Sequence, residues 1–216
     1  IHEPVIDTND GVRATWVEVS LDRLRQNLES IRTRVAPAKV MIVVKANAYG
    51  HGLGTVASQL ASRADYLGVA VLEEGIYLRK LGVKTPILVL GGIWGEQVPL
   101  YLEFDLTFTA SSVERLEQIN TAAGDRHQQA RVHLKIDTGM ERIGVHYYNA
   151  ASLQEAAVRC EHVEVEGIFS HFANADASDL THAKLQLERF NEVLHFYDKK
   201  SLMMPIRHMA NSPAIL

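Results

Sequence analysis

Residues 40–63 read VMIVVKANAYGHGLGTVASQLASR, and this stretch contains one complete unit of the fold. Val40–Val44 is a short run of apolar residues that predicts a strand buried on both faces. Leu53–Arg63 has the apolar spacing of an amphipathic helix. A buried strand followed by a helix is the repeating unit of a parallel α/β sheet.

The same alternation runs along the whole chain. Strands are expected at Thr15–Ser20, Tyr66–Ala70, Thr85–Leu90, Asp105–Thr109, Val132–Ile136, Val163–Phe169 and Ile206–Met209. Helices are expected at Leu21–Val35, Leu72–Leu81, Glu96–Leu102, Ser111–Ala122, Ala150–Arg159 and Leu180–Tyr197. Ser111 is expected to be the N-cap of its helix. Counted from Val40, the chain contains seven strand–helix units.

Seven units leave two architectures open: an open doubly wound sheet, or a TIM-type (β/α)8 barrel, which needs eight units. As a barrel the chain would be truncated, with about seven of the eight units present. Because Ile1 is not Met, we expect the natural N-terminus to lie upstream. The expected domains are an N-terminal segment, residues 1–19, and one barrel domain, residues 20–216, that is incomplete at its C-terminus.

Composition excludes several classes of protein. Lys and Arg number 22 and Asp and Glu 26, a net charge of −4, so the basic footprint of a nucleic-acid-binding protein is missing. Cys160 is the only cysteine, which agrees with a reducing, cytoplasmic compartment. No apolar run approaches the about 18 residues of a membrane span. The polar segment Ile1–Asp10 does not resemble a signal peptide. We therefore expect neither a nucleic acid nor a membrane as partner.

Motifs of other enzyme classes are missing from the sequence. It has no HExxH or CxxC motif, and His182 and His195 are thirteen residues apart, so no metal site is predicted. It has no GxGxxG after a strand and no GxSxG elbow. Barrels carry their active sites at the carboxyl ends of the strands, so the residues that follow each strand are the candidates.

Three cationic residues follow or end predicted strands. Lys45 ends a buried strand, and a desolvated lysine amine can form a Schiff base with a carbonyl group. A lysine at the rim can also extend its ammonium group into solvent. Lys135 alternates with core residues and should point into the barrel, and Arg142 follows in a tight turn. An arginine there suits a carboxylate or a phenolate, although a solvent-facing arginine is an equal alternative.

The last two strands are followed by polar residues. His171 comes after Val163–Phe169, and a histidine there is a candidate acid–base group or a structural hydrogen-bonding residue. Asn211 and Ser212 follow the last strand, and Ser212 can cap the next helix. A helix N-terminus with a hydroxyl group is a natural phosphate site, although a plain N-cap explains the same residues.

Four of these segments together resemble one family. Residues 43–52, VVKANAYGHG, resemble the pyridoxal-phosphate attachment signature of alanine racemases. Residues 15–19 and the helix with Asn27 resemble the opening segment of that family. Residues 135–144, 170–176 and 208–212 match later motifs in the same order. The resemblance covers about residues 13–216 and implies a (β/α)8 barrel that binds pyridoxal 5'-phosphate (PLP).

The resemblance assigns roles residue by residue. Lys45 would hold PLP as an aldimine and act as one of two catalytic bases. Tyr49 and Ser212 would bind the cofactor phosphate, and His171 and Asn211 would line the cofactor. Arg142 would contact the phenolic oxygen of PLP and the substrate carboxylate. Lys135 matches a lysine that is often a carbamate in this family, which turns a cation into an anion that can orient Arg142.

Other parts expected from the resemblance lie outside this sequence. In the family the second base is a tyrosine of a C-terminal β domain, supplied by the partner subunit of a homodimer. The eighth strand contributes an arginine to the pyridine nitrogen and further phosphate contacts. We therefore expect the chain to be a fragment, inactive by itself, in which residues 1–19 contribute a strand to the β domain.

The activity that the resemblance implies is the interconversion of L-alanine and D-alanine, which supplies D-alanine for peptidoglycan. A serine or broad-spectrum racemase is the nearest alternative, although Lys135 and the residues that follow it favour alanine. A non-catalytic PLP-binding barrel and the barrel decarboxylases are further alternatives. In both of these, the cofactor lysine is not followed by the Asn47–Gly52 sequence.

Overall fold

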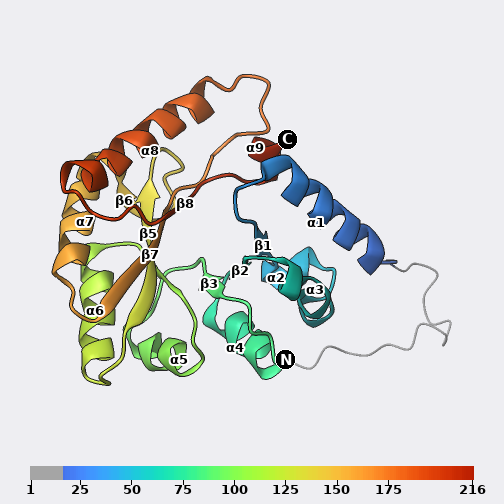
Figure 1. Cartoon of the computed structure of the whole chain (residues 1–216), viewed down its shortest axis with the longest axis horizontal. Coiled ribbons are helices and arrows are strands. Elements are labelled where there is room, and N and C mark those ends of the chain that lie inside the picture. Colours follow the sequence, from blue (N-terminus) through green and yellow to red (C-terminus); the bar gives the residue numbers. More distant parts are fainter. Residues whose placement is uncertain (1–16) are drawn as a thin grey trace.

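The computed structural model describes residues 17–216, in which strands and helices alternate (Figure 1). The strands are β1 Met41–Val43, β2 Tyr66–Val69, β3 Ile87–Val89, β4 Phe108–Ala110, β5 Ala130–Asp137, β6 Val145–His146, β7 Val163–Phe169 and β8 Ile206–His208. The helices are α1 Leu21–Val35, α2 Lys45–Tyr49, α3 Leu53–Leu60, α4 Leu72–Lys80, α5 Val98–Glu103, α6 Val113–Gly124, α7 Ala150–Arg159, α8 Thr181–Lys199 and α9 Ser212–Ile215. Short 3-10 helices are η2 Ala61–Arg63, η3 Gly95–Gln97 and η4 Tyr147–Asn149.

Every strand pair is parallel. One sheet has the order β1-β2-β3 and the other β4-β5-β7-β8, with β6 beside β5, and a bridge between Leu88 and Thr107 joins the two. Apart from the two-residue β6, the spatial order is the sequence order, whereas a doubly wound sheet reverses its order at a switch point. The prediction of an α/β barrel with seven strand–helix units is therefore confirmed. Within residues 17–216, the outermost strands β1 and β8 are not paired with each other.

The helices lie outside the strands (Figure 1), and the strands separate two layers of packing. Alternate strand residues such as Leu67, Ile87 and Val132 belong to the large core cluster that includes the helices. The residues between them point the other way, into a small interior cluster of Tyr66, Leu88 and Phe169, against which Met41 and Leu90 pack. This alternation follows from the two-residue repeat of a strand.

Several predicted boundaries were wrong. Ser112, not Ser111, caps α6, because its Oγ accepts a hydrogen bond from the Arg115 N–H at 3.2 Å. The strand expected at Asp105–Thr109 begins only at Phe108, because Asp105 has a positive φ of 51° in a turn.

The N-terminal predictions lie mostly outside the described residues. This holds for Thr15 and Trp16 of the predicted first strand, and for residues 1–16 of the segment 1–19. Residues 17–20 form no strand. In the described part of the chain, no helix has the length and apolar character needed to cross a membrane.

Candidate active site

The carboxyl ends of the parallel strands meet on one rim of the structure. Lys45 lies two residues after β1 and begins α2, and Arg142 lies in the loop between β5 and β6. His171 lies two residues after β7, and Asn211 lies three residues after β8. The topology therefore brings the residues predicted from sequence to the same edge.

Residues 46–50, directly after Lys45, form a left-handed turn, a conformation that L-amino acids disfavour. Ala46, Asn47, Ala48 and Tyr49 have φ values between 51° and 56°, and Gly50 has a φ of 89°. A left-handed turn costs about 1–2 kcal/mol for each non-glycine residue. Strain of this kind persists only where the surrounding structure enforces it, and such positions cluster at functional sites.

Two side chains hold this turn in place. The Glu74 carboxylate accepts hydrogen bonds from the Ala46 N–H at 2.7 Å and from the Ala70 N–H at 2.8 Å. The Asn47 side chain accepts the Leu53 N–H at 2.7 Å, at the start of α3. Glu74 was missed from sequence because nothing in the order of residues links α4 to the end of β1.

Lys135, Asp137 and Arg142 form one connected turn. Lys135 is 4% exposed, and its Nζ donates to the Ile136 carbonyl at 2.9 Å. Burial, together with the positive charge of Arg142, lowers the pKa of Lys135 to about 8, although Asp137 opposes the shift. The Asp137 carboxylate accepts the N–H groups of Gly139, Met140 and Arg142 at 2.8 to 3.1 Å.

His171 stands close to all three cations of the rim. Burial lowers the pKa of His171, and the charges of Arg142, Lys135 and Lys45 lower it further. The imidazole is therefore neutral at neutral pH, because burial and the neighbouring positive charges both disfavour its charged form.

A glutamine from α8 fixes the loops around His171. Gln186 is fully buried, donates to the His171 carbonyl at 3.0 Å and accepts the Ala173 N–H at 2.9 Å. Nearby, the hydroxyl groups of Thr138 and Ser170 are hydrogen-bonded at 2.8 Å. Gln186 was also missed from sequence, where it is one polar residue on an amphipathic helix.

The segment after β8 differs from the prediction in one respect. Asn211, not Ser212, is the N-cap of α9, because its side chain accepts the Ala214 N–H at 3.1 Å. The Ser212 hydroxyl, at the first position of α9, is therefore not used as the cap. Tyr49 is 62% exposed, and no hydrogen bond joins the Tyr49 or Ser212 side chain to the rest of residues 17–216.

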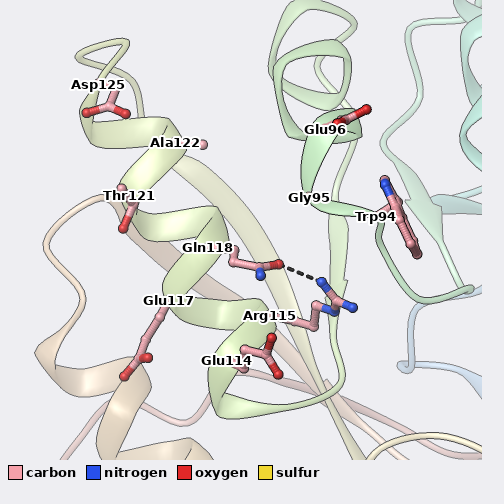
Figure 2. A pocket seen from close by; sticks show the side chains of 10 residues that line it. All are labelled: Trp94, Gly95, Glu96, Glu114, Arg115, Glu117, Gln118, Thr121, Ala122 and Asp125. Atoms are coloured by element: carbon pink, nitrogen blue, oxygen red, sulfur yellow. Dashed lines mark hydrogen bonds between the residues drawn. The ribbon is translucent and has the colours of Figure 1, made fainter.

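A groove lies away from these residues, and a group of three possible metal ligands includes Asp137 of the turn described above. A shallow groove of about 540 Å³ separates η3 from α6 (Figure 2). It is lined by Trp94, Gly95, Glu96, Glu114, Arg115, Glu117, Gln118, Thr121, Ala122 and Asp125, none of them a candidate from the sequence. The ligand atoms of Asp137, Glu141 and His146 lie within 4.8 Å of one another. The Asp137 carboxylate already accepts three backbone N–H groups, so we interpret it as a group that stabilises the turn and not as a metal ligand.

Comparison with known proteins gives one consistent family. Alanine racemase 2 of Caldanaerobacter subterraneus subsp. tengcongensis is 42% identical over 209 residues, 95% of this chain and 54% of that protein. The alanine racemase of Symbiobacterium thermophilum is 40% identical over 208 residues, 96% of this chain and 55% of that protein. The chain thus spans about half the length of the curated relatives it matches.

Solved structures agree with these relatives. An alanine racemase of Clostridium difficile superposes with a TM-score of 0.89 at 36% identity, covering 94% of this chain and 57% of that one. An alanine racemase of Bacillus anthracis with bound L-Ala-P has a TM-score of 0.86 at 31% identity, covering 94% of this chain and 53% of that one. The family profile described as "Alanine racemase, N-terminal domain" matches residues 19–216. The chain therefore belongs to the alanine racemase family, in which it corresponds to the N-terminal domain.

Proposed function

We propose that the protein interconverts L-alanine and D-alanine with PLP as cofactor. The observation that carries the proposal is the position of Lys45, at the end of β1 and directly before a strained left-handed turn. The relatives named above are alanine racemases, and one of the solved structures holds L-Ala-P. The biological role that follows is the supply of D-alanine for peptidoglycan.

The donor groups on the rim suit the chemistry of PLP. A primary amine, as on Lys45, bonds covalently with an aldehyde. The hydroxyl groups of Tyr49 and Ser212 are free to donate to a phosphate. Arg142 would contact the phenolic oxygen and the substrate carboxylate, since a guanidinium group suits both anions. The neutral His171 and Asn211 would line the cofactor.

Racemisation requires a proton to leave Cα on one face and another to return on the opposite face. PLP, when bound, spreads the negative charge left on Cα. The Lys45 amine would take the proton from one enantiomer and return one when the other enantiomer reacts. A second acid–base group is needed on the opposite face. We place it on the partner subunit of a homodimer, outside residues 1–216.

Lys135 is proposed to carry a carbamate. A neutral lysine amine adds to CO2, which forms one N–C bond, releases one proton and leaves an anion. Its pKa of about 8 makes a substantial share of the Lys135 amine neutral at pH 7.5 to 8. The product would replace a buried cation beside Arg142 with an anion, which removes a costly like-charge contact. Carbon-13 NMR of the full-length protein in labelled bicarbonate should show a carbamate signal that the variant K135M lacks.

The test of the activity uses the full-length protein loaded with PLP. Borohydride reduction should attach a pyridoxyl group to the Lys45 peptide, and K45A should lower racemisation of L-alanine by at least about 10²–10⁴-fold. K39A, which changes an exposed lysine before β1, is the control and should keep both properties. A label on a different lysine would refute the assignment.

The same assay separates the alternatives. A higher kcat/KM for L-serine than for L-alanine would favour a serine or broad-spectrum racemase. PLP binding without racemisation of either amino acid would favour a non-catalytic barrel. The proposed location is the cytoplasm, supported by the single Cys160.

A further inference from the structure

The interior of the barrel holds a chain of polar side chains that the proposed function does not use. Its members are Tyr66 on β2, Thr107 before β4, His133 on β5, Glu166 on β7 and His208 on β8. Thr107 and His133 are fully buried. Buried polar groups destabilise a fold unless they are paired, so this row of polar side chains requires an explanation.

A β-bulge on β7 brings Glu166 into the interior. Val132 of β5 lies opposite Val165, but His133 lies opposite Gly167, so Glu166 is an additional residue with no partner of its own. Val165 packs with the outer core, as Val132 does, which leaves Glu166 and Gly167 together on the interior side. Bulges commonly redirect a side chain in this way.

Gly167 makes room for His133. A Cβ atom at position 167 would lie 2.5 Å from His133 Nδ1, closer than any real contact. The imidazole therefore lies across β7 and reaches the next strand, where its Nδ1 is 2.8 Å from His208 Nε2. Bulge and glycine together connect β5 to β8 through the interior.

The direction of the hydrogen bonds follows from Glu166. The Tyr66 hydroxyl donates to the Glu166 carboxylate, so the Thr107 hydroxyl, 3.0 Å away, must donate to Tyr66. His133 Nε2 is 3.7 Å from Glu166 Oε2 and has no hydrogen-bond partner within residues 17–216. At this distance no hydrogen bond is formed, but the carboxylate is the charged group that faces His133 Nε2 and so attracts a proton on that nitrogen.

The charge states of Glu166 and His208 agree with this direction of the hydrogen bonds. The interaction with His133 lowers the pKa of Glu166, and the Tyr66 hydrogen bond adds to this, although burial opposes it. Burial lowers the pKa of His208 to about 3, and the positive charge of Lys135 lowers it further. Glu166 is therefore an anion and His208 is neutral at neutral pH.

We propose that Glu166 and His133 are positioning residues that fix the tautomer of His208. The Glu166 carboxylate holds the proton of His133 on Nε2, so His133 Nδ1 accepts the Nε2–H of His208. His208 Nδ1 is then left with a lone pair that can accept a hydrogen bond. The role in catalysis rests on the proposed function: His208 stands three residues before Asn211, and its carbonyl accepts the N–H of Ser170, next to His171.

The test is nitrogen-15 NMR of the histidine side chains in the full-length, PLP-loaded protein. His133→Asn and His208→Asn assign the signals by their loss. We expect a pyrrole-type Nε2 and a pyridine-type Nδ1 for both histidines, with this tautomer favoured by at least about tenfold, because the negative charge of Glu166 attracts a proton on the ring nitrogen nearest to it. A proton on His133 Nδ1, whether in the other tautomer or in a doubly protonated ring, would overturn the proposal.

A matched pair of variants tests the part played by Glu166. E166Q keeps the shape but removes the charge, so the tautomer ratio of His133 and His208 should fall below about tenfold. E164Q, on the exposed face of the same strand, should leave it unchanged. Unchanged shifts in E166Q would show that the carboxylate does not set the tautomers, and would refute the proposal.

Racemisation is measured separately on the same samples. The predicted tautomers without racemisation would refute the proposed function and leave the proton arrangement standing. Racemisation with the opposite tautomers would refute the proton arrangement alone. If both hold, E166Q should also lower kcat/KM for L-alanine while E164Q does not, and equal kcat/KM in the two variants would overturn the positioning role.

Discussion

Lys135 and Arg142 carry the same formal charge but meet different surroundings. Lys135 is buried beneath the rim, with its Nζ 5.1 Å from the centre of the Phe169 ring, whereas Arg142 is exposed. Burial disfavours the charged form of an amine, so the pKa of Lys135 lies below its usual value. Lys135 therefore gains and loses its proton near pH 8, within the range that stability measurements cover.

The buried lysine should make stability depend on pH. Its pKa is about 8 in the fold and 10.5 in the unfolded chain, so between these values the unfolded state binds more protons. The free energy of unfolding should therefore rise with pH across that window, by up to about 3 kcal/mol. Urea denaturation of the full-length protein in CO2-free buffer measures this rise.

The variants K135M and K39M separate this effect from the background. K135M should lose the rise, because the titrating amine is gone. K39M removes an exposed lysine and should keep it. The same pH dependence in both variants would contradict the assignment to Lys135.

Short elements between the strands hold the site in shape. The left-handed turn at residues 46–49 adopts a conformation that its residue types disfavour, and Glu74 and Asn47 fix it by hydrogen bonds. On the far side of the rim, Gln186 of α8 fixes the segment after β7 in the same way. Both arrangements join a loop to a helix that is distant in sequence.

Ala46 offers a test of the strain in the turn. Glycine adopts a positive φ without steric cost, so Ala46→Gly should raise the free energy of unfolding by up to about 1 kcal/mol. Ala151→Gly, at an exposed position of α7, should lower it by about 0.5–1 kcal/mol. Chemical denaturation measures both, and a change of the same sign in the two variants would argue against a strained turn.

Gln186 offers a test of the second arrangement. Gln186→Leu leaves the His171 carbonyl and the Ala173 N–H without their partner, which should lower the free energy of unfolding by about 1–3 kcal/mol. Hydrogen exchange at the Ala173 amide should become faster. Asn191→Leu, on the exposed face of α8, is the control and should change stability by less than about 0.5 kcal/mol. Unchanged exchange at Ala173 would contradict the role of Gln186.

At the scale of the whole molecule, the interior polar chain connects the two sheets. Tyr66 belongs to the sheet β1-β2-β3, and its hydroxyl donates to Glu166 of the sheet β4-β5-β7-β8. The backbone joins the sheets only through the bridge between Leu88 and Thr107 within residues 17–216. The side-chain contact therefore reinforces a weak junction.

Tyr66→Phe should weaken that junction. Loss of the hydroxyl leaves Glu166 without its donor, which should lower the free energy of unfolding by about 1–3 kcal/mol. Hydrogen exchange should become faster in β1 to β3 relative to β5 and β7. Tyr101→Phe is the control, because the Tyr101 ring is buried but its hydroxyl has no hydrogen-bond partner in the described part of the chain. Equal effects of the two variants would contradict a link through Tyr66.

From the sequence, the order of strands and helices could be predicted better than the side-chain contacts between them. The residues of α7 and β7 were predicted to the residue, because apolar periodicity depends only on neighbours in the chain. The left-handed turn was not predicted, because Ala46 and Ala48 favour the opposite hand. Glu74, Gln186 and Glu166 act across the fold, so no local pattern could assign them. At both mistaken caps a second capping residue stood next to the true one.

The bulge on β7 also has a consequence for length changes in the chain. Glu166 is the one surplus residue of its strand, so its removal would restore a regular alternation of inward and outward side chains. Removing Ile168 instead would shift Phe169 to the opposite face of the sheet. The protein should therefore fold without residue 166 but not without residue 168. Because the pairing of β7 does not require residue 166, the role of Glu166 lies in its carboxylate and not in the strand.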